Sequence, residues 1–188
     1  MIELDPVDRI TADAVGSPGE RVFYIQASAG DKLVTLLVEK QQVQLLAASV
    51  LEILTRVGRE TGAGPPEEAM GLHEPIEPEW RAGRLSIGYD EERDLILLEA
   101  EEATGEEDED LDDEASEEEI LEPIDLGTSD DPGRVRFWAT RDQMLSLARH
   151  GAAVCAKGRP LCPLCNNPLG PGTHVCPALN GQREQDET

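Results

Sequence analysis

The sequence has few aromatic residues, few basic residues and no long apolar run. Two Trp, two Tyr and two Phe make up 3% of the 188 residues, which argues against a pocket that holds its ligand by aromatic stacking. Sixteen Lys and Arg residues stand against 40 Asp and Glu, giving a net charge of −24. This charge would repel a phosphate backbone, so general affinity for nucleic acid is not expected. No stretch approaches the roughly 20 apolar residues needed to cross a bilayer, so no membrane span is expected.

The beginning of the sequence also lacks the features of an export signal. Residues 1–6 contain neither a basic region nor an apolar region after it. We therefore expect a cytoplasmic protein, in a compartment where disulfides are rare. Four cysteines in a reducing compartment indicate metal binding or buried thiols in preference to disulfide bridges.

Acidic residues are concentrated in one segment. Between Glu99 and Glu119, 14 of 21 residues are acidic and none is basic. Such a segment cannot bury enough apolar surface to offset the entropy lost on ordering, so we predict a disordered insertion over 99–132. The rest of the chain is predicted to form one domain in two parts, 1–98 and 133–160. A zinc-binding tail follows at 161–181, and a disordered end at 182–188.

The apolar pattern elsewhere indicates strands and helices. Two β-rich runs around a Gly-containing loop predict one hairpin, and two more around an acidic turn predict another. The predicted strands are at 21–27, 32–39, 85–89, 95–98 and 134–139. Apolar residues at helical spacing predict a helix over 43–57, and a capping-box signature at Thr140 and Gln143 begins a second helix that ends before Gly158. We predict an α+β fold: one antiparallel sheet built from two hairpins plus a fifth strand, two packed helices and a C-terminal zinc-bound tail.

The tail carries a metal-ligand pattern. Cys162 and Cys165 have the C-x-x-C spacing that brings two thiolates to one metal. His174 and Cys176 are two residues apart, so an extended segment presents both to the same side. Three thiolates and one imidazole form a closed tetrahedral set, which predicts one structural zinc ion per chain.

Other roles for the cysteines fit the sequence less well than zinc binding. A redox C-x-x-C pair usually begins a helix in a βαβ unit, whereas Cys162 follows a helix stop. A disulfide would need an oxidising compartment. Cys155 is a possible fifth donor, but its place on the apolar stripe of the preceding helix favours a small buried thiol.

Segments at both ends of the chain carry a family resemblance. They are 5–10 (DPVDRI), 15–21 (VGSPGER), 23–26 (FYIQ), 39–43 (EKQQV), 158–165 (GRPLCPLC), 174–177 (HVCP) and 180–181 (NG). Together they resemble the actinobacterial family of uncharacterised proteins DUF3090, over most of the chain apart from the acidic insertion. The resemblance implies no defined activity.

The sequence offers little to support catalysis. It contains no phosphate-binding G-x-x-x-x-G-K-[ST] loop, no G-x-G-x-x-G and no G-x-S-x-G elbow. His73 lies in a Pro-rich loop and His150 on the predicted polar face of the second helix, so both are expected to be solvated surface residues. A hydrolase or transferase is therefore the least favoured alternative.

A basic stretch offers a candidate binding surface. Residues 133–159 contain six Lys and Arg against one Asp, and Arg134 and Arg136 share a strand face. Arg134, Arg136, Arg141 and Arg149 are the predicted partner-binding residues, although a solvated face that balances the acidic insertion explains them as well. We expect a non-enzymatic zinc-binding accessory or adaptor protein that acts through protein contacts. A nucleic-acid-binding accessory protein that uses the 133–159 face is the main alternative, and the oligomeric state is not indicated.

Overall fold

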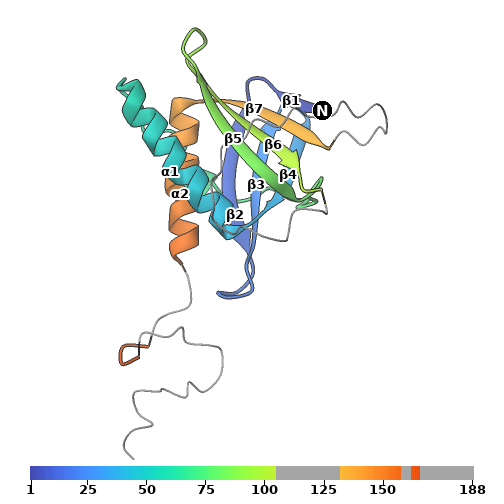
Figure 1. Ribbon diagram of the computed structural model, residues 1–188, viewed down its shortest axis with the longest axis vertical. Helices are drawn as coiled ribbons and strands as arrows, with labels where there is room; N and C mark the ends of the chain where they lie inside the picture. The colour runs from blue at the N-terminus through green and yellow to red at the C-terminus, as the bar shows by residue number, and fades with distance from the viewer. Residues whose placement is uncertain (105–131, 158–161, 166–188) are drawn as a thin grey trace, which may run out of the picture.

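The computed structural model describes residues 1–104, 132–157 and 162–165, and Figure 1 shows how they are arranged. Within these ranges no helix has the length and apolar character that crossing a membrane requires. The elements, in chain order, are β1 (Ile2–Leu4), β2 (Arg9–Val15), β3 (Val22–Ala29), β4 (Lys32–Val38), α1 (Lys40–Val57), a short 3-10 helix (Glu67–Ala69), β5 (Ala82–Asp90), β6 (Leu95–Glu102), β7 (Arg134–Thr140) and α2 (Arg141–Ala156).

The α+β class is confirmed, but the prediction of one antiparallel sheet is wrong. The described strands form two sheets, one with the order β1-β7-β6-β5 and one with the order β2-β3-β4. The first sheet is mixed because β1 runs parallel to β7, with Ile2 beside Val135. Both predicted hairpins are present, as β3–β4 and β5–β6. β1 and β2 were not predicted from the sequence.

The two sheets meet at two corners. At the first corner the chain passes from β1 to β2: the Val7 amide donates to the Trp138 carbonyl (2.8 Å) and the Asp8 amide to the Ser28 carbonyl (2.8 Å). At the second corner, the Leu37 amide of β4 donates to the carbonyl of Trp80 (3.0 Å), just before β5. Backbone pairing therefore continues from one sheet towards the other at both corners, and the sheets enclose a common core.

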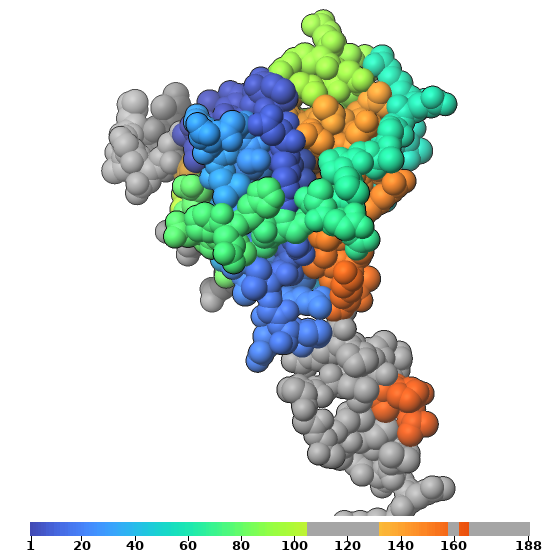
Figure 2. Space-filling view, turned by 180° about the vertical axis from the view of Figure 1, so that it is seen from behind, coloured from blue at the N-terminus to red at the C-terminus, as the bar shows by residue number. Residues whose placement is uncertain are grey.

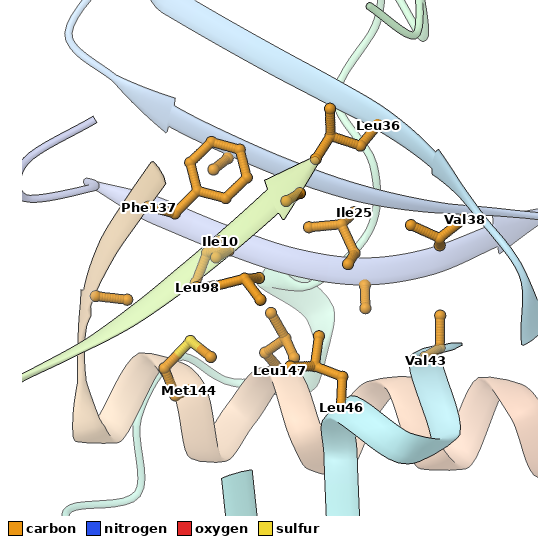
Figure 3. Packing of buried hydrophobic residues seen from close by; sticks show 14 of the residues in the cluster. Ile10, Ile25, Leu36, Val38, Val43, Leu46, Leu98, Phe137, Met144 and Leu147 are labelled. Carbon is orange, nitrogen blue, oxygen red and sulfur yellow. The ribbon is translucent and has the colours of Figure 1, made fainter. Parts of the chain in front are cut away.

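The core lies between the sheets and the two helices. Figure 3 shows Ile25 and Leu36 from one sheet, Phe137 from the other, and Leu46 and Leu147 from the helices pointing towards one another. α1 buries the face predicted from helical spacing, with Val43, Leu46, Ala47 and Val50 inside. α2 begins at the predicted capping box, because the Thr140 hydroxyl accepts a hydrogen bond from the Gln143 amide.

The strand before the acidic insertion is longer than predicted. β6 continues to Glu102, four residues beyond the predicted boundary at Leu98. Its buried residues alternate with Glu99 and Glu101, which is the period expected of a half-buried strand. Ala103 and Thr104 follow it, and the remainder of the predicted insertion, 105–131, lies outside the described residues.

A polar layer joins the three-stranded sheet to the segment between α1 and β5. Figure 2 shows this segment, in turquoise to green, lying across the blue strands and against α2 in orange. Gln26 of β3 is fully buried; its amide nitrogen donates to the His73 carbonyl (2.9 Å) and its oxygen accepts from the His73 amide (2.7 Å). The same nitrogen lies 3.0 Å from the Thr35 hydroxyl, and the Thr11 hydroxyl donates to the Met70 carbonyl. One side chain thus pairs with a loop as a neighbouring strand would.

The beginning of the same segment is held by the first turns of α2. The Gly62 amide donates to the Asp142 carboxylate (2.7 Å), and the Ser146 hydroxyl donates to the Pro65 carbonyl (3.0 Å). Gly64 adopts a φ of +70°, and a Cβ placed on it would overlap the Asp142 carbonyl oxygen and the Ser146 hydroxyl. Only glycine fits so close an approach of loop to helix without strain.

Candidate functional site

The structure describes two of the four predicted zinc ligands. Cys162 is followed by a turn at 163–165 that ends on Cys165. Cys162 is 6% exposed and Cys165 is half-buried. His174 and Cys176 lie outside the described residues, so the zinc site stays a prediction. Within the described ranges no three His, Cys, Asp or Glu side chains form a metal-binding group.

Cys155 occupies a different environment from the C-x-x-C pair. It is 4% exposed, and its thiol lies 3.8 Å from the Lys40 carbonyl at the start of α1. Burial raises the pKa of this thiol, although the nearby Lys40 charge acts in the opposite direction. A protonated thiol is a poor metal ligand, so the described contacts fit a packing role between the two helices.

Two of the four predicted partner-binding arginines lie side by side on the outer face of the four-stranded sheet. Their register places Arg134 beside Glu101 and Arg136 beside Glu99 of β6. The Arg134–Glu101 ion pair is 2.7 Å long and the Arg136–Glu99 pair is 2.5 Å long. Hydrogen bonding to Glu99 raises the pKa of Arg136. Both guanidinium groups therefore already have a carboxylate partner, and an external anion would have to compete with it.

Arg141 serves a different purpose at the start of α2. Its side chain is 14% exposed and forms two hydrogen bonds with Asp94, of 2.8 and 3.1 Å. It also donates to the Glu60 carbonyl (2.9 Å), just after α1. Asp94 accepts a further hydrogen bond from the Tyr89 hydroxyl (2.6 Å). Arg141 therefore ties the β5–β6 turn to the end of α1. Among the four predicted residues, Arg149 alone is classed as exposed.

The Asp94 network predicts a measurable pH effect. The hydrogen bonds from Arg141 and then Tyr89 hold the pKa of Asp94 below its ordinary value, so the folded state favours the ionised carboxylate. This stabilisation is complete above the unfolded pKa of about 4 and is lost as the pH falls through the lower folded pKa. Asp94→Asn should therefore lower the urea midpoint at about pH 7 and much less at about pH 3.

Two features of the chain allow the Asp94→Asn variant to be compared directly with the wild type. Asp94 has a φ of 53°, a conformation that Asn also adopts readily. Asp31→Asn, in the exposed β3–β4 loop, is the matched control and should not change the midpoint. An Asp94→Asn deficit that is equal at both pH values would show that the ionised carboxylate contributes nothing.

The prediction that His150 is a solvated surface residue is wrong. Its side chain is 10% exposed, and its Nε2 atom lies 3.5 Å from the Asp13 carboxylate on β2. The helical face that carries it is covered by the segment before β5, which the sequence pattern did not reveal. Between that segment and α2 lies a cavity of about 340 Å³, lined by Ala63, Gly64, Pro65, Pro66, Glu67, Met70, Ser146, Arg149, His150 and Ala153.

The chemistry that this cavity offers is limited. Neither ring nitrogen of His150 is accessible to solvent or hydrogen-bonded within the described residues. A ligand in the cavity therefore reaches neither ring nitrogen in this arrangement. The Ser146 hydroxyl is engaged by the Ala63 and Pro65 carbonyls. His73, by contrast, is exposed as predicted.

Comparison with known proteins identifies a family for this chain but indicates no activity. The family described as "Protein of unknown function (DUF3090)" matches residues 2–176, which include both β1 and all four predicted zinc ligands. No curated protein matches the chain. No solved structure matches it either.

Proposed function

The chain belongs to the DUF3090 family, and from that premise we propose that it is a non-enzymatic zinc-binding adaptor that acts through protein contacts. In this proposal Cys162, Cys165, His174 and Cys176 bind one structural zinc ion. The zinc shapes the tail that follows α2, and the α+β domain carries that tail. Zinc binding and folding of so short a segment would be coupled.

The turn between Cys162 and Cys165 is the observation that supports the zinc ion most directly. A C-x-x-C segment must reverse direction to aim both sulfur atoms at one metal, and the turn at 163–165 provides such a reversal. The family match extends to Cys176, the last of the four ligands. Three thiolates and one imidazole leave no open coordination position, which favours a structural role.

The charge pattern of the outer sheet face favours protein contacts over nucleic acid. Arg134 and Arg136 alternate with Glu101 and Glu99 across two strands, so the face carries both signs of charge. A nucleic acid would have to displace carboxylates from these arginines, at a cost in desolvation and lost ion pairs. A protein surface can match both signs at once.

Elemental analysis of the full chain, purified without chelator under reducing conditions, tests the metal. We expect about one zinc ion per chain, as a closed four-ligand set requires. Cys162→Ser with Cys165→Ser should remove it, because two of the four ligands are lost, while the melting temperature of the domain stays the same. Cys155→Ala is the matched control: it should keep the zinc and lower the melting temperature, because that thiol packs between the helices. Intact, reduced protein without metal would contradict the zinc proposal.

The same variants test the adaptor role. A protein partner that depends on the tail should be captured by the wild type and by Cys155→Ala, but not by the zinc-free double variant. Capture that is equal for all three chains would place the binding surface away from the zinc tail. Retention on a phosphate-bearing resin that falls steeply with salt would favour nucleic acid instead.

A further inference from the structure

The four-stranded sheet ends in a free strand. β5 is the last strand in the order β1-β7-β6-β5, and β6 lies on its inner side. The side chain of Gln42, from α1, donates to the carbonyls of Ala82 and Gly83 (3.0 Å each) and so occupies the first part of the outer edge. Along residues 84–90 no other described strand pairs with that edge. Seven residues of backbone are thus left to pair with another strand.

This edge lacks several of the devices that usually protect such strands. Proteins block free edges with proline, bulges, short length, charged side chains or a covering helix or loop. Residues 84–90 (RLSIGYD) contain no proline, and the only irregularity of the strand lies before them, between Ala82 and Arg84. The side chains that face the core side are Leu85, Ile87 and Tyr89, all apolar or aromatic and only half-buried. An unprotected edge with an unfinished apolar face is suited to strand addition.

The sequence of this edge is complementary to itself. We infer that two copies of the chain form a symmetric dimer in which their β5 strands pair antiparallel, centred on Ile87. In that register Ile87 faces Ile87 of the second copy, and Leu85 faces its Tyr89 on the core side. On the outer side Arg84 faces Asp90 of the second copy, and two-fold symmetry makes this ion pair twice.

Neighbouring registers are poorer. A shift by one residue would place core-facing side chains opposite outward-facing ones, which antiparallel pairing does not allow. A shift that centres the pair on Gly88 sets Leu85 opposite Glu91, an apolar side chain against a carboxylate. A shift that centres it on Ser86 sets Arg84 opposite Gly88 and loses both ion pairs. Of the registers centred on Ser86, Ile87 and Gly88, the one centred on Ile87 pairs opposite charges with each other and apolar side chains with each other.

The neighbouring helix provides apolar surface for the same interface. α1 lies along β5 in Figure 1, and its Leu45 is 60% exposed. Two hollows separate the helix from the strand, one of about 260 Å³ that Leu45, Leu46, Leu85 and Ile87 help to line, and one of about 270 Å³ beside Ile53, Val57 and Tyr89. A second strand at the edge of β5 would cover these half-buried side chains and bring the two α1 helices together on the core side.

Net charge sets the conditions for the test. Each copy carries −24, so self-repulsion opposes association at low ionic strength. At roughly 0.3 M salt the electrostatic screening length falls to about 6 Å. Salt then weakens the long-range repulsion between the two copies more than it weakens the ion pairs in direct contact. Sedimentation equilibrium of the full chain at about 10–500 µM in this salt should show a monomer–dimer equilibrium.

Arg84→Glu tests the register. It turns both intersubunit ion pairs into repulsions, so we expect the dissociation constant to rise by about tenfold or more. Lys32→Glu, at the exposed start of β4, makes the same change in net charge away from the interface and should leave the dissociation constant as it is. Adding Asp90→Asn to Arg84→Glu should restore part of the affinity, because one carboxylate of each repulsive pair becomes neutral. Asn can still accept the turn hydrogen bonds that Asp90 receives from the Glu92 and Arg93 amides.

The double variant is informative because Arg84 and Asp90 lie far apart within one copy of the chain. Arg84 and Asp90 lie six residues apart on one strand, about 20 Å, which is too far for direct interaction within a copy in this salt. Coupling between them therefore reports contact with the second copy. A chain that remains monomeric at every concentration would overturn the inference and leave the edge to a strand from another protein. A dimer that Arg84→Glu and Lys32→Glu weaken equally would overturn it too.

Discussion

Gln26→Leu is expected to lower the free energy of unfolding by about 2–4 kcal/mol, because it removes a buried side chain that holds a loop on the sheet. The side chain is fully buried and makes two hydrogen bonds with the backbone of His73. Leucine has a similar size but can neither donate nor accept. The amide and the carbonyl of His73 would then lack partners wherever water does not reach them, and each such group costs about 1–3 kcal/mol.

Chemical denaturation measures this effect, and Thr35→Val is the graded control. Valine has nearly the shape of threonine, and the change removes only the hydroxyl that lies 3.0 Å from the Gln26 amide. A loss of about 1 kcal/mol is expected for that single bond. Gln26→Leu should also increase proteolysis between residues 66 and 79, since the segment loses both hydrogen bonds that hold His73 on the sheet. Equal effects of the two substitutions would show that the bonds to His73 contribute little.

Gly64→Ala is expected to destabilise the protein by about 2–4 kcal/mol, through two causes that act together. A φ of +70° is unfavourable for alanine by about 1 kcal/mol. The added methyl group would also overlap the Asp142 carbonyl, which belongs to the backbone of α2 and cannot move aside. The loop would therefore move away from the helix and lose the hydrogen bonds of Gly62 and Pro65.

Gly71→Ala provides the control for this second prediction. Gly71 lies in the same segment, and a Cβ placed on it would meet no atom within 4 Å. That variant should unfold at nearly the wild-type denaturant concentration. If Gly64→Ala did the same, the close approach of the loop to α2 would contribute nothing to stability.

Local pattern was sufficient to predict the hairpins and both helices. In α1 the spacing of Val43, Leu46 and Val50 marked the buried face, and in α2 the Thr140–Gln143 capping box marked the first turn. Alternation in β7 also placed Arg134 and Arg136 on one exposed face correctly. These features depend on residues close together in the chain, where periodicity and capping carry the information.

Features that depend on distant partners were not predicted. β1 has only three residues and pairs with a strand that begins at Arg134, so no local pattern revealed it. Glu99 and Glu101 were assigned to the acidic insertion, which hid the partners of Arg134 and Arg136. His150 was placed on a polar helical face because the covering segment approaches it from more than 80 positions earlier in the chain. The second pair of zinc ligands lies outside the described residues, so the metal site remains a prediction.

The parallel pairing of β1 with β7 has a consequence for synthesis on the ribosome. Ile2 pairs with Val135, so the first strand has no partner until 133 further residues have been added. At about 5–20 residues per second, translation of that stretch takes roughly 7–27 s. During this time Ile2 and Leu4 cannot reach β7, whereas the β2–β3 and β3–β4 hairpins can form from adjacent residues. Completion of this domain is therefore a late event in translation, and nascent chains that end before α2 is complete at Ala156 are expected to need chaperones.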